Sequence, residues 1–220
     1  MNPQRENPCN MERGDADLEE AQKVLLFLPN GFEALEASAF TDVFGWNQVV
    51  GDKRTPLITA GIRPLLKCTW NFTVQPEKQL EDLDLTEFAA LAMPGGFQRA
   101  GFYEDGYDER TLSMIRHFAS QDKWIASVCV GALPIAKSGV LSGLKSTTYH
   151  LESGRWQAQL EAMGTKVERD LRLVEDGKVI TSSCPSTAVE VAFRLLERLT
   201  STENARKVRV EMGYSEFSIF

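Results

Sequence analysis

Three continuous apolar runs, each followed by a turn and a helical pattern, constrain the fold of this chain most. They are Lys23–Leu28, Phe88–Met93 and Lys123–Val128. A run without polar alternation is typical of a strand buried on both faces, as in a parallel sheet covered by helices. The 220 residues suffice for one well-buried domain. We therefore expect an α/β fold, a three-layer sandwich with a mostly parallel sheet and helices on both faces.

The rest of the chain fits this alternation. Apolar residues at helical spacing predict helices over 33–50, 109–121, 132–140, 154–163 and 188–199. Strand-like segments are expected at 55–60, 68–74 and 145–150, and a hairpin turns at Asp176-Gly177. Residues 101–106 have the polar and aromatic composition of a loop. We divide the chain into a disordered leader (1–21), a main domain (22–200) and a C-terminal extension (201–220).

Composition excludes several classes of function. The net charge is −7, and no basic face can be found along the chain, so we expect no nucleic-acid partner. No apolar stretch approaches the roughly 18 residues of a membrane span. The first residues lack the apolar core of a signal peptide, so a cytoplasmic protein is expected. The four cysteines form no C-x-x-C pair and only two histidines are present, so no metal site is expected.

Cys129 stands where the third apolar run ends and a helical run begins, in the segment Ala126-Ser127-Val128-Cys129-Val130-Gly131. A sharp turn between strand and helix exposes its central side chain to free backbone N–H groups, which favour an anion. A thiol placed there should ionise easily and act as a nucleophile. The alternative is a buried cysteine that serves only packing.

Other chemistry-bearing residues follow strand ends, where ligands sit in parallel α/β sheets. The N–H groups of Gly96, in the Gly95-Gly96 turn, and of Val130 could bind a developing oxyanion. Glu33 and Glu36, one helical turn apart, could move protons, although acidic residues also favour a helix start for electrostatic reasons. Tyr149 and His150 end the predicted strand 145–150, with His150 either a general base or a polar edge residue.

These motifs resemble the ThiJ/PfpI superfamily, which includes the Parkinsonism-associated deglycase. The resemblance covers about 23–200 and is carried by Met93-Pro94-Gly95-Gly96, by the cysteine turn, by Gly31–Glu36, by Lys145–Thr148 and by Val179–Ser182. It implies a flavodoxin-like sandwich, a homodimer and a reactive cysteine at Cys129. It also implies a supporting glutamate at Glu36 and an oxyanion site at Gly96 and Val130.

Two departures from the family pattern limit the activities that can be expected. Val130 replaces the histidine that follows the nucleophile in the family's peptidases, so peptidase activity is not expected. Glyoxalase and deglycase members often carry a histidine directly after the paired threonines, where this chain has Tyr149, with His150 one residue later. The isonitrile hydratase branch is also similar around the cysteine turn, but it has an Asp where this chain has Glu36 and a Thr after the cysteine where this chain has Val130.

The favoured hypothesis is an enzyme that needs no cofactor. In it, Cys129 adds to a small carbonyl substrate such as a 2-oxoaldehyde, Gly96 and Val130 hold the oxyanion, and Glu36 moves the proton. The alternative is a redox sensor or stress chaperone in which Cys129 is oxidised, with Glu36 stabilising the product and Cys184 able to resolve it as a disulfide. A third hypothesis is a lyase like isonitrile hydratase.

Overall fold

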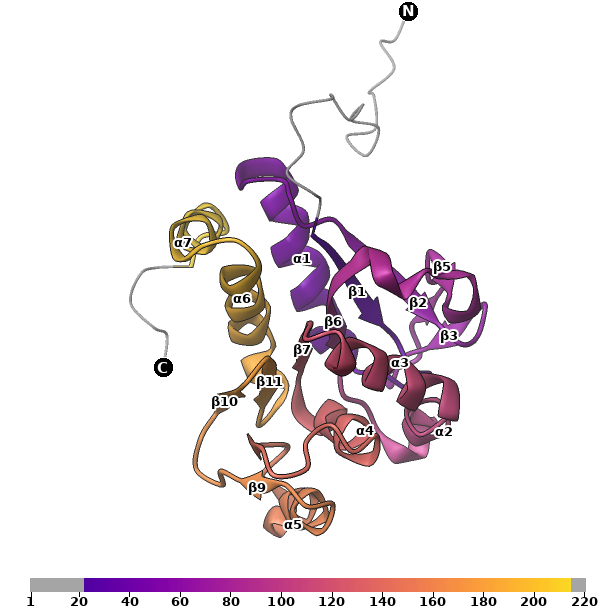
Figure 1. The fold of residues 1–220 in the computed structure, drawn as a ribbon. Coiled ribbons are helices and arrows are strands. Elements are labelled where there is room, and N and C mark those ends of the chain that lie inside the picture. Colours follow the sequence, from indigo (N-terminus) through magenta and orange to yellow (C-terminus); the bar gives the residue numbers. More distant parts are fainter. Residues whose placement is uncertain (1–21, 215–220) are drawn as a thin grey trace, which may run out of the picture.

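A computed structural model describes residues 22–214, so the predicted leader and the last six residues lie outside the described part (Figure 1). Between residues 22 and 214 the central sheet has seven strands in the order β10-β11-β7-β6-β1-β2-β5. All neighbouring strands pair in parallel except β10, which runs antiparallel to β11. The central strands are β1 Lys23–Phe27, β2 Leu57–Gly61, β6 Phe88–Met93, β7 Trp124–Ser127 and β11 Val179–Ser182. The edges are β5 Lys78–Gln79 and β10 Leu173–Asp176.

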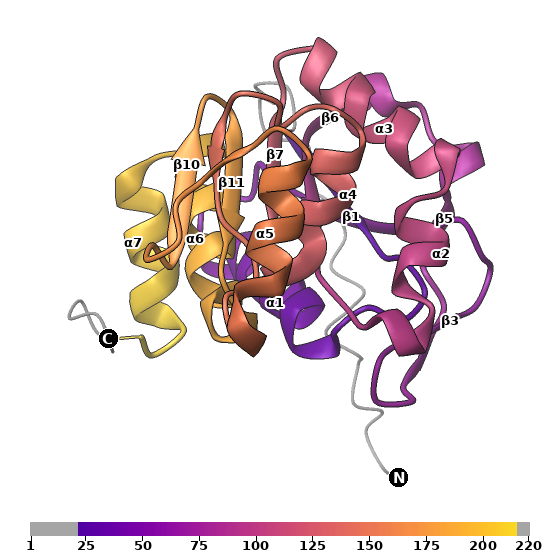
Figure 2. The same cartoon turned by 90° about the horizontal axis from the view of Figure 1, so that it is seen from below.

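Helices cover both faces of the sheet (Figures 1 and 2). One layer holds α1 Ala34–Val50 and α6 Ala188–Leu199, and α7 Thr202–Glu211 packs against both of them. The other holds α3 Glu109–Ser120 and α4 Ala132–Lys137, flanked by α2 Phe102–Gly106 and α5 Arg155–Ala162. The three-layer α/β sandwich predicted from the apolar runs is therefore confirmed, as is the flavodoxin-like fold that the family resemblance implies. No helix in the described range is both long and apolar enough to cross a membrane.

The buried strands are the best-predicted elements. β6 begins and ends at the predicted residues, and every side chain of β1 after Lys23 is buried. Continuous burial removes apolar surface on both sides of the sheet, which is the dominant favourable term in folding. The predicted hairpin is also confirmed, with β10 and β11 joined at Asp176-Gly177.

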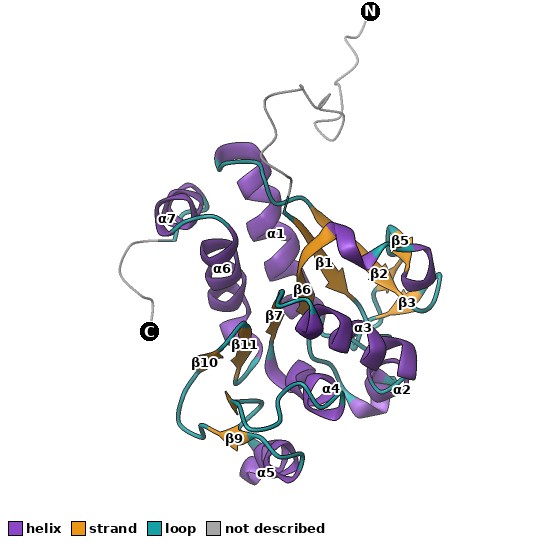
Figure 3. Ribbon diagram, in the orientation of Figure 1, coloured by secondary structure: helices purple, strands orange, loops and turns teal. Residues whose placement is uncertain are grey.

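Three local predictions are wrong. Residues 68–74 form no single strand: β3 Leu66–Lys67 pairs with β4 Thr73–Val74 across a tight turn in which Asn71 has a φ of 72°. The predicted loop 101–106 contains the short helix α2, which fully buries Phe102. The predicted strand 145–150 stops at Ser146, because β8 Lys145–Ser146 pairs only with β9 Lys166–Val167, outside the main sheet (Figure 3).

Helix α7 lies in the predicted C-terminal extension and was not expected from the sequence. The Asn204 amide accepts a hydrogen bond from the Asp52 N–H (2.9 Å) and donates one to the Asn47 side chain (2.8 Å). The ring of Tyr214 meets that of Phe193 edge-on at 5.7 Å. Residues 201–214 therefore cover the outer side of the α1 and α6 layer.

The sheet topology decides where functional residues meet. Strands β1, β6, β7 and β11 stand together in the sheet and run in the same direction, so their carboxyl ends share one edge. The segments that follow them contain Glu36, Gly95, Cys129 and Cys184, respectively. Residues far apart in the sequence are thus brought to one place, as expected for a parallel α/β sheet.

Candidate active site

Cys129 occupies a strained turn between β7 and α4. Its φ of 53° lies in the left-handed region, which costs a non-glycine residue about 1–2 kcal/mol. The following Gly131 is needed for close packing, since a Cβ there would lie 2.9 Å from the carbonyl oxygens of Met93 and Pro94. The Thr148 hydroxyl donates a hydrogen bond of 2.8 Å to the Cys129 carbonyl. These contacts fix the predicted elbow and aim the thiol at the edge of the sheet.

Glu36 lies in the first turn of α1 and is buried, with 1% of its surface exposed. Its Oε2 accepts a hydrogen bond of 2.5 Å from the Gly95 N–H, and its carboxyl group is hydrogen-bonded to the Cys129 thiol. A Cβ at Gly95 would lie 3.0 Å from both Glu36 Oε2 and the Val130 nitrogen. Glycine at this position therefore lets the carboxyl group approach the cysteine turn.

Burial sets the protonation of this pair. Loss of water raises the pKa of Glu36 to about 8, against the lowering effect of the Gly95 hydrogen bond. Burial also raises the pKa of the Cys129 thiol, and a negative charge on Glu36 raises it further, whereas the hydrogen bond from the Val130 N–H lowers it. The prediction that the turn by itself makes the thiol ionise easily is therefore wrong, because burial raises the pKa of Cys129 more than the Val130 N–H lowers it. A protonated Glu36 removes the repulsion and can donate a hydrogen bond to the thiolate.

The predicted oxyanion donors lie beside the cysteine. The N–H of Val130 faces the Cys129 sulfur. Gly96 forms a bridge with Phe32, in which the Glu33 N–H bonds the Gly95 carbonyl (2.8 Å) and the Phe97 N–H bonds the Gly31 carbonyl (3.2 Å). This pattern leaves the Gly96 N–H out of the bridge. Gly96 and Val130 both line the cavity that contains Cys129.

The structure separates the remaining predicted site residues. Glu33 is buried at the start of α1, and its Oε1 accepts a hydrogen bond of 2.9 Å from the indole N–H of Trp70, so it acts beside the site and not in it. Tyr149 lines the cavity, and burial raises its pKa. His150 is exposed, does not line the cavity, and places Nδ1 3.4 Å from the Ser183 carbonyl oxygen.

The prediction of a strand over 145–150 does not decide whether Tyr149 or His150 faces Cys129. The backbone after Ser146 is not extended in a ladder, because Thr147 and Thr148 bond to Thr181 and Cys129 instead. Tyr149 is therefore the residue that reaches the site. The paired threonines were part of the recognised motif, but their role in holding the elbow could not be read from the sequence.

The cavity around Cys129 has a volume of about 1080 Å³, slightly above the range of roughly 300–1,000 Å³ typical of small-molecule sites. Its wall includes Cys184, from the turn after β11, together with residues that the sequence did not single out: Leu35, Phe97, Arg99, Leu151, Arg155 and Trp156. Leu35 lies within the Gly31–Glu36 motif, whereas the other five come from loops and helix starts without a motif, so no local pattern could have identified those five. Within residues 22–214 no cluster of three or more histidine, cysteine or acidic side chains is arranged to hold a metal ion.

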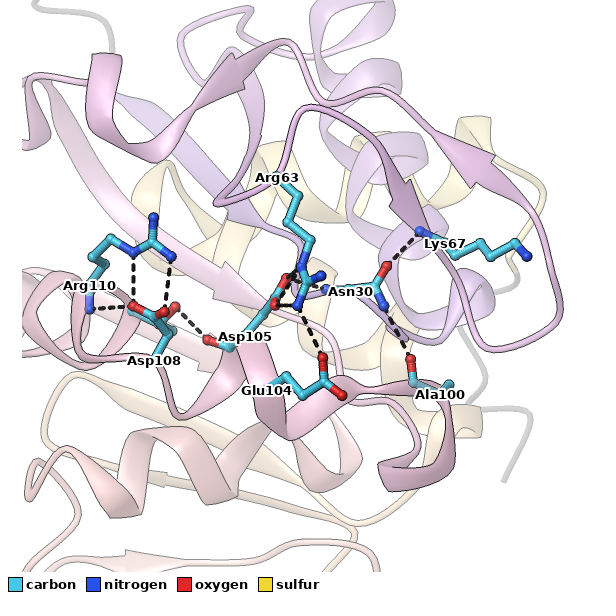
Figure 4. Close-up of polar contacts among 9 residues, drawn as sticks. Asn30, Arg63, Lys67, Ala100, Glu104, Asp105, Asp108 and Arg110 are labelled. Atoms are coloured by element: carbon cyan, nitrogen blue, oxygen red, sulfur yellow. Dashed lines mark hydrogen bonds and ion pairs between the residues drawn. The ribbon is translucent and has the colours of Figure 1, made fainter.

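A buried polar network supports the loop that leads to Glu36 (Figure 4). Asp105, whose side chain is 1% exposed, accepts hydrogen bonds from the Asn30 N–H (2.9 Å) and from Arg63 Nε (2.8 Å). The Asn30 side chain bonds the Ala100 carbonyl and the Lys67 N–H. The network ties the segment after β1 to α2 and to the β3 turn, and so fixes the approach of α1 to the site.

The comparisons with known proteins agree with this geometry. The DJ-1/PfpI family model matches residues 22–198. The chain is 28% identical to protein dj-1beta of Drosophila melanogaster over 190 residues, covering 86% of this chain and 95% of that protein. It is 27% identical to an isonitrile hydratase of Pseudomonas putida (74% and 67% covered). It is also 26% identical to deglycase PH1704 of Pyrococcus horikoshii (74% and 91% covered).

Solved structures show the same fold. The crystal structure of Drosophila melanogaster DJ-1beta superposes with a TM-score of 0.78 at 25% identity, covering 89% of this chain and 99% of that chain. Oxidised Toxoplasma gondii DJ-1 superposes with a TM-score of 0.75 at 23% identity, covering 89% and 100%. The family match spans the strands, the cysteine elbow and the glutamate beneath it. The chain therefore belongs to the DJ-1/PfpI family.

Proposed function

We propose that this protein is a cysteine-dependent enzyme that acts on a small carbonyl compound, in the manner of a glyoxalase or deglycase. The observation that carries the proposal is the pair formed by Cys129 and Glu36. A thiol on a strained turn is hydrogen-bonded to a carboxyl group whose pKa of about 8 keeps it protonated at neutral pH. A protonated acid beside a nucleophile is the arrangement that general acid–base catalysis needs.

The proposed reaction with a 2-oxoaldehyde begins when the Cys129 sulfur attacks the aldehyde carbon. A C–S bond forms, the carbonyl π electrons move to oxygen, and the N–H groups of Gly96 and Val130 stabilise the oxyanion until it takes a proton. The oxyanion takes its proton from Glu36, and the resulting carboxylate removes the proton from the former aldehyde carbon to give an enediolate. Glu36 returns this proton to the neighbouring carbonyl carbon while the hydroxyl proton on the sulfur-bearing carbon passes to the neighbouring oxygen, which leaves a 2-hydroxy thioester. Water hydrolyses the thioester, and the net reaction adds one water to give a 2-hydroxy acid.

The test is consumption of methylglyoxal without glutathione, with lactate measured as product. We expect turnover by the wild-type protein, a fall of at least about 100-fold in Cys129→Ser, and a fall of about 100-fold in Glu36→Gln. Cys184→Ser is the matched control, because it removes the second thiol that lines the cavity. Loss of turnover in Cys184→Ser but not in Cys129→Ser would overturn the assignment.

A second candidate is redox sensing through the same thiol. Two thiols, Cys129 and Cys184, line one cavity, and the Glu36 carboxyl lies in hydrogen-bond contact with the first of them. Peroxide would convert the Cys129 thiolate to a sulfenic acid with release of hydroxide. Selective oxidation of Cys129 without turnover of methylglyoxal would favour this candidate. Hydration of isonitriles, named for the Pseudomonas putida relative, is a third candidate and is tested by supplying an isonitrile in place of methylglyoxal.

A further inference from the structure

The cavity around Cys129 carries an arginine, Arg99, that no acidic side chain of the described residues neutralises. Arg99 lines the cavity and is exposed. Among residues 22–214, no carboxylate forms an ion pair with it. Its guanidinium carbon lies 5.9 Å from the ring centre of Trp70 and 5.6 Å from that of Phe97. The cation is thus held by aromatic faces, which leaves its N–H donors available to a ligand.

The aromatic support of Arg99 is itself anchored. The rings of Trp70 and Phe97 lie 5.5 Å apart, and the indole N–H of Trp70 donates to the buried carboxylate oxygen of Glu33. Phe97 follows the Gly95-Gly96 turn, whose bridge to Phe32 fixes the start of this segment. Arg99 therefore lies against the Trp70 and Phe97 rings, and Phe97 directly follows the Gly95-Gly96 turn that supplies a predicted oxyanion donor. A planar guanidinium held in this way is suited to bidentate binding of a carboxylate.

The other charges of the cavity cancel. Arg155 forms an ion pair of 2.5 Å with Glu152, and its guanidinium also stacks on Trp156 at 4.5 Å. Glu36 is protonated at neutral pH because burial raises its pKa to about 8. Arg99 is left as the uncompensated charge of the cavity lining, so the cavity is positive in a chain with a net charge of −7. Such a local field concentrates anions at the site.

A second hollow on the far side of Arg99 has the same sign. It has a volume of about 390 Å³ and is lined by Lys67 and Arg99, without an acidic residue. Since Arg99 belongs to the walls of both hollows, an anion bound to it has room on either side. The remaining lining of the second hollow mixes polar side chains, Asn30, Thr69 and Asn71, with Cys68, Trp70 and Ala100.

We propose that Arg99 binds a carboxylate of the substrate, so that the site favours a 2-oxoaldehyde that carries a carboxylate over a neutral one such as methylglyoxal. This inference rests on the proposed function and deepens it, because it names the substrate class of the same site. Arg99 is a specificity-determining residue in this view: it binds the anionic end while Cys129 attacks the carbonyl carbon. Selection arises because a carboxylate finds a fixed cation, whereas a neutral group of the same size leaves that cation unpaired.

The test measures alkylation of Cys129, which needs no turnover. Iodoacetate and 6-iodohexanoate are each compared with their neutral amides in a Cys184→Ser background, and labelling of the Cys129 peptide is followed by mass spectrometry. The two acids differ in reach, so one of them can place its carboxylate at Arg99. The quantity compared is the rate of Cys129 alkylation by each acid divided by the rate with its amide. At low ionic strength and for at least one of the two acids, we expect this ratio to be about tenfold higher in the protein that keeps Arg99 than in Arg99→Gln.

Two further variants complete the design. Arg99→Lys should retain part of the preference, because it keeps the charge but loses the bidentate geometry. Arg116→Gln is the matched control: it changes the net charge equally on α3, away from the cavity, and should leave the ratio unchanged. A ratio that differs by less than twofold between the Arg99 protein and Arg99→Gln at both lengths would overturn the proposal. Failure of the proposed function would show separately, as absence of methylglyoxal turnover.

Discussion

The carboxyl group of Glu36 accepts a hydrogen bond of 2.5 Å from the backbone N–H of Gly95, 59 residues further along the chain. This bond joins the first helix to the loop after β6 and holds the acid against the Cys129 thiol. Burial penalises the charged form of this carboxyl group. Glu36 therefore keeps its proton at neutral pH while it contacts the Cys129 thiol.

The raised pKa of Glu36 predicts a pH-dependent stability. The group binds its proton up to about pH 8 in the folded chain and only up to its ordinary value of 4.5 when unfolded. Its contribution is therefore complete below pH 4.5 and is lost as pH rises toward 8, by up to about 1.4 kcal/mol per pH unit. Urea unfolding of wild-type and Glu36→Gln protein between pH 4.5 and 8 measures the difference. We expect the variant to gain stability relative to wild type as pH rises; parallel curves would contradict the assignment.

The left-handed backbone at Cys129 predicts an unusual order of stability. Glycine adopts a φ of 53° without steric cost, whereas alanine does not. Cys129→Gly should therefore be more stable than Cys129→Ala by about 1 kcal/mol, the reverse of the usual order. Thermal unfolding of the two variants checks this. Ala126→Gly, within β7, serves as the control. This variant should be less stable than the wild-type protein, which has alanine at this position.

The positions of Tyr149 and His150 predict unequal effects on turnover. Tyr149 lines the cavity, and its pKa is raised by burial and then by the charge of the nearby Cys129. His150 is exposed and lies against the Ser183 carbonyl. We expect His150→Ala to keep kcat/KM for methylglyoxal within about twofold and Tyr149→Ala to lower it by about tenfold or more. A large loss in His150→Ala alone would mean that the segment rearranges to bring the imidazole to the thiol.

The buried network at Asp105 predicts a large loss of stability on its removal. Asp105→Asn replaces an acceptor-only group by one that carries donors facing the Asn30 N–H and Arg63. Asp105 is buried whereas Arg63 is partly exposed, so the cost comes mainly from leaving buried hydrogen-bonding groups unsatisfied, and we expect a loss of about 2 kcal/mol in urea unfolding. Glu161→Gln removes the exposed partner of Arg169 and should cost less than about 0.5 kcal/mol. Equal effects of the two changes would contradict the structural role of Asp105.

A homodimer, which the family resemblance implies, remains a proposal that α1 supports. Leu35, Trp46 and Val49 lie on one side of this helix and are 58%, 41% and 62% exposed. We propose that this side contacts a second copy of the chain. Sedimentation should then show a dimer for wild type and a monomer for Trp46→Glu. Val210→Glu is the control, because it adds a charge at another exposed apolar residue, on α7. A monomeric wild type, or a dimer in Trp46→Glu, would contradict this interface.

The sequence alone determined the fold class and the positions of the buried strands. Phe88–Met93 is apolar throughout because both of its faces are covered, so its burial is written in consecutive residues. The elbow at Cys129 was also marked locally, by the change from an apolar strand run to a helical run. The C-terminal helix α7 escaped prediction because it buries only Ala205 and Val208, which make too short an apolar pattern, and it packs on α1 and α6.

Only the tertiary structure decided how the site is assembled. That Glu36 meets Cys129 while Glu33 turns to Trp70 depends on where α1 enters the edge of the sheet, which the Gly95 N–H and the Asp105 network fix. Whether Tyr149 or His150 reaches the cavity depended on hydrogen bonds of Thr147 and Thr148 to residues in other strands and turns. Local sequence encodes burial and turns, but the direction of a polar side chain and its protonation follow from partners that are distant in the chain.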